Sequence, residues 1–147
     1  MTTSALLMSV LAHKADLNEY TKMQIYYANK HDTLSGQVSK YASWDQKWNE
    51  AYDEALNPTK KIKFQGVEYG TDANPEGMTP ELAKLYAYSK APHYDETRYE
   101  ILVEEDTEME ALNELYATLI EETKATVQAE EEKLAEYAKD TNMLGGS

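Results

Sequence analysis

Apolar side chains recur with a seven-residue rhythm in the N-terminal part of the sequence. They occupy two alternating positions of one heptad frame: Val10, Leu17, Tyr20, Tyr27, Leu34, Val38, Tyr41, Trp48, Tyr52 and Ala55. One helix cannot bury such a stripe alone, so the stripe requires a partner helix along its length. The pattern predicts a long helix over residues 3–56, capped by Thr3 or Ser4, with Leu34, Val38 and Trp48 in its core. Pro58 ends the helix, because proline disfavours helical backbone in the residue before it.

Polar residues interrupt the stripe without breaking its phase. His13, Gln24, His31 and Asp45 occupy the same frame. Such residues fix the register or the number of partners, at some cost in stability, or they mark where the partner helix ends. Gly36 falls on an outward position, so we expect the helix to continue through it.

The segment 57–94 has a different pattern and forms a central insertion. Ile62 and Phe64 alternate with polar residues before Gln65-Gly66, and Val67 and Tyr69 alternate after it. This arrangement predicts a small β-hairpin. Because a two-stranded hairpin is marginal alone, it should cover this chain's own helices or a neighbouring subunit. Thr79-Pro80-Glu81 then begins a short helix that ends near Ser89.

A second long helix is expected over residues 95–140, followed by a tail at 141–147. Its stripe includes Leu102, Met109, Leu112, Tyr116, Leu119, Thr123, Val127, Leu134 and Tyr137. After Leu119 the stripe drifts from a strict heptad, which predicts contacts with more than one neighbour. The Gly-Gly-Ser end is either native or a remnant of an expression vector. The sequence therefore predicts one mainly α domain over 1–147, an elongated, coiled-coil-like antiparallel helical hairpin with a small β-hairpin and short helix inserted.

Charge is strongly segregated along the chain. Residues 95–147 hold sixteen acidic and four basic residues, whereas residues 57–70 hold three lysines and one glutamate. The acidic helix should repel nucleic acid and anionic lipid, so we expect neither as a partner. No stretch approaches the ~20 apolar residues of a membrane-spanning helix. The apolar run from Ala5 to Ala12 follows no basic residue and continues into the heptads, which disfavours a cleaved signal peptide.

Catalytic and metal-binding motifs are weak. Asp72 to Gly77 resembles the start of a calcium-binding loop, but its twelfth position is Ala83, where a glutamate is required. The His93 to Glu96 segment is better explained as a capped helix start. The chain has no cysteine, no paired metal-ligand motif on a helix and no phosphate-binding glycine loop. We therefore expect a protein that is not an enzyme and has no cofactor or metal.

The aromatic content is unusual, with twelve tyrosines and two tryptophans against a single phenylalanine. Tyrosine and tryptophan suit surfaces that are buried against a partner while a polar atom keeps its hydrogen bond. Packing against the central insertion of the same chain is the alternative explanation. The predicted interaction residues are Leu17, Tyr27, Leu34, Val38, Tyr41, Trp44, Trp48, Tyr52, Phe64 and Tyr69.

The apolar run Leu6-Leu7-Met8-Ser9-Val10-Leu11-Ala12, followed by a long polar-rich coil, resembles the start of filament and translocator subunits of type III secretion systems. The resemblance covers about the first 40 residues and implies long terminal helices around a central insertion; small phage virion proteins show the same pattern. We therefore expect a self-associating structural subunit, either a homo-oligomer or one of several subunits, in a secreted filament, secretion apparatus or virion. The alternative is a coiled-coil adaptor or chaperone that binds a partner's helix. A secreted assembly or virion is favoured over the cytoplasm.

Overall fold

The computed structural model describes the backbone of residues 2–70 and 75–145 and the side chains as far as Asp140. Its elements are α1 (Thr3–Leu56), β1 (Ile62–Phe64), β2 (Val67–Tyr69), α2 (Pro80–Lys90) and α3 (Glu96–Gly145). The chain divides into two compact units. Unit 1 joins Met1–Asp32 to Thr107–Ser147, and unit 2 is the continuous segment Thr33–Asp106.

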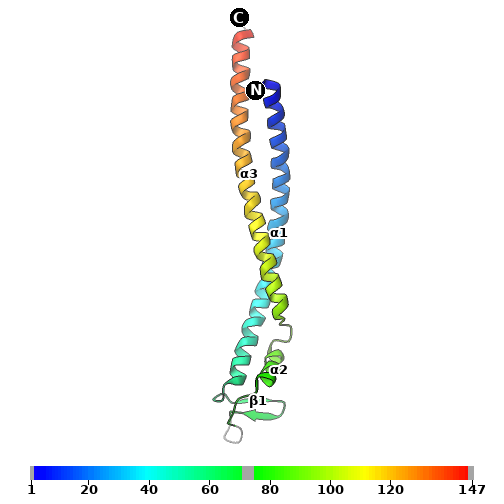
Figure 1. The fold of residues 1–147 in the computed structure, drawn as a ribbon, viewed down its shortest axis with the longest axis vertical. Coiled ribbons are helices and arrows are strands. Elements are labelled where there is room, and N and C mark those ends of the chain that lie inside the picture. The colour runs from blue at the N-terminus through cyan, green and yellow to red at the C-terminus, as the bar shows by residue number, and fades with distance from the viewer. Residues whose placement is uncertain (1, 71–74, 146–147) are drawn as a thin grey trace. The chain divides into compact units, whose positions relative to one another are not determined.

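The two long helices pack antiparallel, as contacts within each unit show (Figure 1). In unit 1 His13 contacts Glu130 and the Tyr27 ring stacks on Tyr116, so residue numbers rise along α1 as they fall along α3. In unit 2 Ser35 donates a hydrogen bond of 2.9 Å to Asp106. The predicted mainly α fold, with a helical hairpin and a small β-hairpin and short helix between its arms, is confirmed.

The heptad stripe of α1 is the face that packs. Every stripe position from Val10 to Ala55 is buried or half-buried, including the polar ones, whereas outward positions such as Gly36 are exposed. Leu34, Val38 and Trp48, which were expected in the core, are all half-buried, and Trp48 packs against the core of unit 2. In a pair of helices each stripe is covered by a single partner helix, so part of each large side chain stays exposed to solvent.

The stripe of α3 keeps a stricter heptad than the sequence indicated. The positions turned inward are Tyr99, Leu102, Asp106, Met109, Asn113, Tyr116, Ile120, Thr123, Val127, Glu130, Leu134 and Tyr137. Ile120, Val127 and Leu134, which the sequence prediction placed in the stripe after Leu119, are buried or half-buried. Leu112 and Leu119 are half-buried beside the stripe, and polar Asp106 and Asn113 occupy stripe positions that the sequence prediction did not include. The helix also continues beyond the predicted end at Asp140 as far as Gly145.

Side-chain caps set the helix starts. The Thr2 hydroxyl accepts a hydrogen bond from the Ala5 backbone at 3.1 Å, so the cap of α1 lies just before the predicted Thr3. Thr79 caps α2 ahead of Pro80, as predicted. Asp95 accepts from the Arg98 backbone at 3.0 Å and caps α3, which confirms the helix-start interpretation of that acidic segment.

The core of unit 2 is built on small residues. Ala51 and Ala55 of α1 and Ala83 and Ala87 of α2 are buried with Met78 and Tyr86. Alanines four residues apart lie on the same side of a helix, and their small side chains allow the two helices to approach closely. Ile62, Phe64 and Tyr69 pack against this core. The β-hairpin therefore lies against helices of its own chain.

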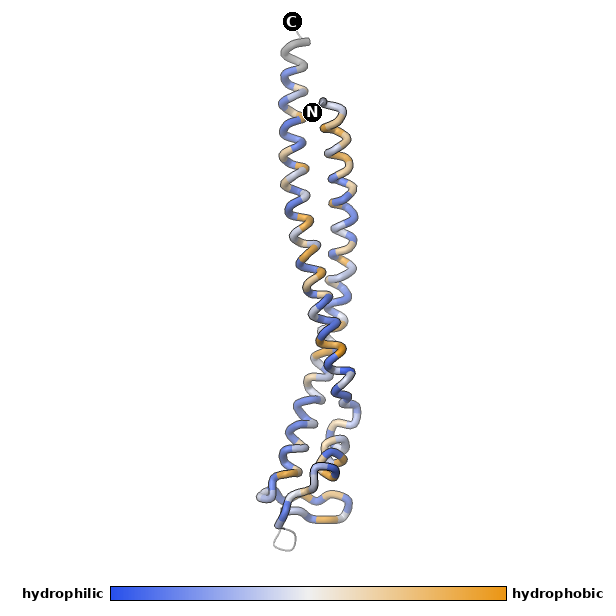
Figure 2. The backbone as a smooth tube through the Cα atoms, viewed as in Figure 1, coloured by the Kyte–Doolittle hydropathy of each residue, from blue (hydrophilic) through white to orange (hydrophobic). Residues whose placement is uncertain are grey.

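Apolar residues alternate with polar ones along both long helices (Figure 2). Within the described residues, no helix is long and apolar enough to cross a membrane.

Candidate interaction surfaces

An aromatic cluster lies where α1 and α2 meet in unit 2. The Trp48 ring stacks on Tyr52, with centroids 5.2 Å apart and planes inclined by 10°. It meets Tyr88 of α2 edge-on at 5.5 Å and Tyr94 at 5.8 Å. The Trp48 indole nitrogen is buried without a hydrogen-bond partner among the described residues. These contacts belong to one chain, as the alternative explanation of the aromatics predicted.

Three further ring contacts lie in unit 2, and one of them, between Trp44 and His93, joins α1 to the central insertion. Trp44 packs on Tyr41 at 4.9 Å and on His93 at 5.6 Å. Phe64 of the hairpin meets Tyr86 of α2 edge-on at 5.4 Å. Each such pair contributes about 0.5–1.5 kcal/mol beyond its buried area.

All the predicted interaction residues are half-buried. Leu17 and Tyr27 lie in unit 1; Leu34, Val38, Tyr41, Trp44, Trp48, Tyr52, Phe64 and Tyr69 lie in unit 2. The structure brings together Tyr41 with Trp44, and Trp48 with Tyr52, through ring contacts. Their role toward a second protein stays a prediction.

A polar network surrounds Asp45, one of the polar stripe residues. Its carboxylate accepts hydrogen bonds from the Tyr94 hydroxyl and from the Asn49 amide, the latter at 3.1 Å. Lys84 and Glu96 line the same shallow hollow. Burial and the hydrogen bond to Asp45 raise the pKa of the Tyr94 hydroxyl above its ordinary value of 10.0. The network satisfies a carboxylate that the heptad frame turns inward.

Replacing Tyr94 with phenylalanine should lower the free energy of unfolding by about 1–2 kcal/mol at neutral pH, because Asp45 loses a donor. The raised pKa adds a pH dependence. The hydroxyl's contribution is complete below about pH 10 and is lost as the pH rises toward the folded-state pKa. The difference between the wild type and Tyr94→Phe should therefore shrink above pH 10 in urea unfolding at several pH values. A difference that stays constant up to pH 11 contradicts this role.

Polar and charged side chains of α1 and α3 meet near the stripe of unit 1. The His13 Nδ1 atom lies 2.7 Å from a carboxylate oxygen of half-buried Glu130. Lys14 forms an exposed ion pair with Glu131, also at 2.7 Å. The polar position His13 thus has a partner of matching polarity on α3, which fixes the register of the two helices.

An uncovered apolar surface lies near the start of α1. Leu6 and Val10 are each 3% exposed, whereas Leu7, Met8 and Leu11 are 48%, 71% and 58% exposed. We call Leu7, Met8 and Leu11 the N-terminal patch. The sequence prediction missed this surface. The unbroken apolar run was the available signal, because a helix that is apolar on all sides can be covered by one partner helix on one side only.

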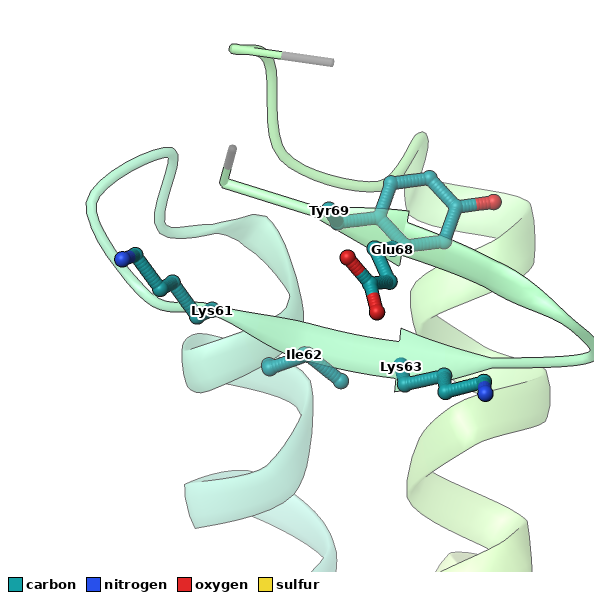
Figure 3. A pocket seen from close by; sticks show the side chains of 5 residues that line it. All are labelled: Lys61, Ile62, Lys63, Glu68 and Tyr69. Atoms are coloured by element: carbon teal, nitrogen blue, oxygen red, sulfur yellow. The ribbon is translucent and has the colours of Figure 1, made fainter. Parts of the chain in front are cut away.

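The β-hairpin carries a shallow hollow (Figure 3). It is lined by Lys61, Ile62 and Lys63 on and just before β1 and by Glu68 and Tyr69 on β2. Lys63 lies opposite Glu68 in the antiparallel register. The lining therefore combines charged side chains with two residues, Ile62 and Tyr69, that also pack against the core of unit 2.

Other candidate chemistry finds no geometric support among the described residues, where no group of three or more histidine or acidic side chains is placed to hold a metal ion. The calcium-loop resemblance falls partly on residues 71–74, which lie outside the described part of the chain. No protein-family model, curated protein or solved structure matches this chain.

Proposed function

We propose that this protein is a self-associating structural subunit of a larger assembly. The observation that carries the proposal is the N-terminal patch. Large side chains on the outer face of a long helix stay uncovered there, while their neighbours Leu6 and Val10 are buried. Uncovered apolar clusters of this kind mark protein interaction surfaces. A non-enzymatic role in a filament, a secretion apparatus or a virion is consistent with this surface.

Charge favours a second copy of the chain as the occupant of the N-terminal patch. The chain has a net charge of −13, so two copies repel each other over most of their surfaces. No ionisable side chain lies between Thr2 and Ala12. Two copies can therefore meet at this segment with little local repulsion. Full burial of one leucine or methionine side chain contributes about 1.5–3 kcal/mol, so burying the three side chains of the N-terminal patch in each copy favours association.

The test is sedimentation of the wild type and of a Leu7→Gln/Leu11→Gln variant over a range of concentrations. The wild type should grow in mass with concentration, and the variant should weaken this association at least tenfold. Helix content should not change, because both side chains are exposed. The matched control is Ile25→Gln/Leu115→Gln, which also removes two exposed apolar side chains from unit 1. A wild type that stays monomeric at all concentrations contradicts the proposed function.

The runner-up is an adaptor or chaperone that grips a partner's helix. The half-buried stripe favours it, because Leu17, Tyr27 and Val38 each keep an open edge that a third helix can cover. An adaptor of this kind stays monomeric alone and forms a complex of fixed stoichiometry with its partner. The same sedimentation series therefore separates the two functions.

A further inference from the structure

The described part of α3 has an outer face rich in carboxylates that lack a cation. Glu121, Glu130 and Glu131 have basic or histidine partners within the chain. The exposed residues without an ion pair in the described structure include Glu104, Glu108, Glu110, Glu114, Glu132 and Glu136. These six form three pairs spaced four residues apart, so each pair lies on one side of the helix. Like charges at this spacing repel each other, and an external cation would relieve that repulsion.

The β-hairpin carries the opposite charge on a fixed platform. Lys60, Lys61 and Lys63 are exposed and make no ion pair with the described residues. The alternate side chains Ile62 and Phe64 pack against the core of unit 2. Because the pleat sends successive side chains to opposite faces, anchoring these two residues places Lys61 and Lys63 on the other face of the strand. The backbone that carries these lysines is thus anchored by the packing of the alternate side chains.

We propose that the basic face of the β-hairpin in one copy docks on the acidic outer face of α3 in a second copy. This inference rests on the proposed function and names a second contact for it. Charge complementarity selects the occupant, because α3 presents exposed carboxylates and the hairpin presents lysines without intrachain partners. Glu68 lies opposite Lys63 and shares its face, so the outward positions of the hairpin carry two lysines and one glutamate.

The two docking faces belong to different surfaces of the chain, and each copy carries one of each. A contact between unlike surfaces is heterologous and repeats from copy to copy. It closes into a ring or continues as an open chain, depending on the rotation between copies. Growth beyond a dimer therefore follows from this contact, whereas self-contact between two N-terminal patches stops at two copies.

The experiment is a charge exchange followed by mixing. The hairpin-reversed variant is Lys61→Glu/Lys63→Glu. Three α3-reversed variants each change one pair to lysine: Glu104 with Glu108, Glu110 with Glu114, and Glu132 with Glu136. Sedimentation is measured at about 0.1 M salt, where the Debye length of about 10 Å screens distant repulsion but preserves close contacts. The matched control, Lys40→Glu/Lys47→Glu, makes the same charge change at exposed positions of α1.

The hairpin-reversed variant should associate at least tenfold more weakly than the control. Mixing it with one of the α3-reversed variants should restore large species, because both contacts in the mixture again join unlike charges. The pair that restores assembly then locates the docking site on α3. Circular dichroism should show unchanged helix content for every variant.

Three results would overturn the inference. The hairpin-reversed variant and the control associate equally, no mixture restores assembly, or the hairpin lysines prove necessary only for binding to anionic vesicles. In each case a wild type that still assembles leaves the proposed function standing. A wild type that never assembles removes both proposals.

Discussion

Replacing Leu102 with alanine is expected to lower the free energy of unfolding by about 2–5 kcal/mol. Leu102 is 1% exposed and is the largest fully buried side chain in the described structure. Most other stripe residues are half-buried, so few neighbours can move in to fill the space. The loss therefore combines the transfer of a leucine side chain to water with a cavity that stays open.

The matched control for Leu102 is its neighbour Ile101, which is 41% exposed. Ile101→Ala removes a similar apolar mass from the same helical turn and should cost less than about 1 kcal/mol. Urea unfolding of both variants, followed by circular dichroism, measures the difference. Equal losses for the two variants would show that Leu102 is not enclosed as described.

Replacing Gly70 with alanine should destabilise the hairpin severely. The residue has a φ of +74°, and an added Cβ atom would lie 2.0 Å from the Lys60 carbonyl oxygen and 2.7 Å from its carbon. A backbone carbonyl cannot rotate away as a flexible side chain does. The chain at the end of β2 must therefore shift, and Tyr69 loses its packing against the core of unit 2.

Gly66 provides the control, because its φ is +80° and nothing lies within 4 Å of an added Cβ atom. Both substitutions cost about 1–2 kcal/mol for placing alanine in the left-handed region. Only Gly70→Ala also incurs the steric clash, so it should lose at least about 2 kcal/mol more than Gly66→Ala in urea unfolding. Similar losses of unfolding free energy for the two variants would mean that the Lys60 backbone can shift at little cost.

The heptad phase made α1 predictable from the sequence, because regular spacing decides which face of a long helix is buried. The stripe of α3 was harder to identify. Asp106, Asn113 and Glu130 occupy inward positions, and apolar Leu112 lies beside them. Hydropathy alone therefore identified the apolar positions of the stripe but missed its polar ones. The polar inward residues depend on partners such as Ser35 and His13, which only the antiparallel register brings near.

The central insertion shows a second limit of sequence reasoning. The turn residues and the alternation predicted the hairpin, and the cap with proline predicted α2. The alanine core was missed, because Ala83 and Ala87 have no distinctive chemistry until two helices approach closely. The aromatics were candidates both for a partner surface and for intrachain packing. Contacts such as Trp48 with Tyr88 depend on where the insertion folds back, which spacing does not specify.

The division of the chain into units has a consequence for the order of folding. Unit 2 is one continuous segment, whereas unit 1 joins the N-terminal and C-terminal segments. Closing short loops costs less entropy than closing long ones, so unit 2 should form first. At a synthesis rate of about 5–20 residues per second, His13 waits roughly 6–23 s for Glu130 to be made. During this interval the C-terminal segment of unit 1 is absent, so we expect Leu6 and Val10 to be exposed on the nascent chain together with the N-terminal patch.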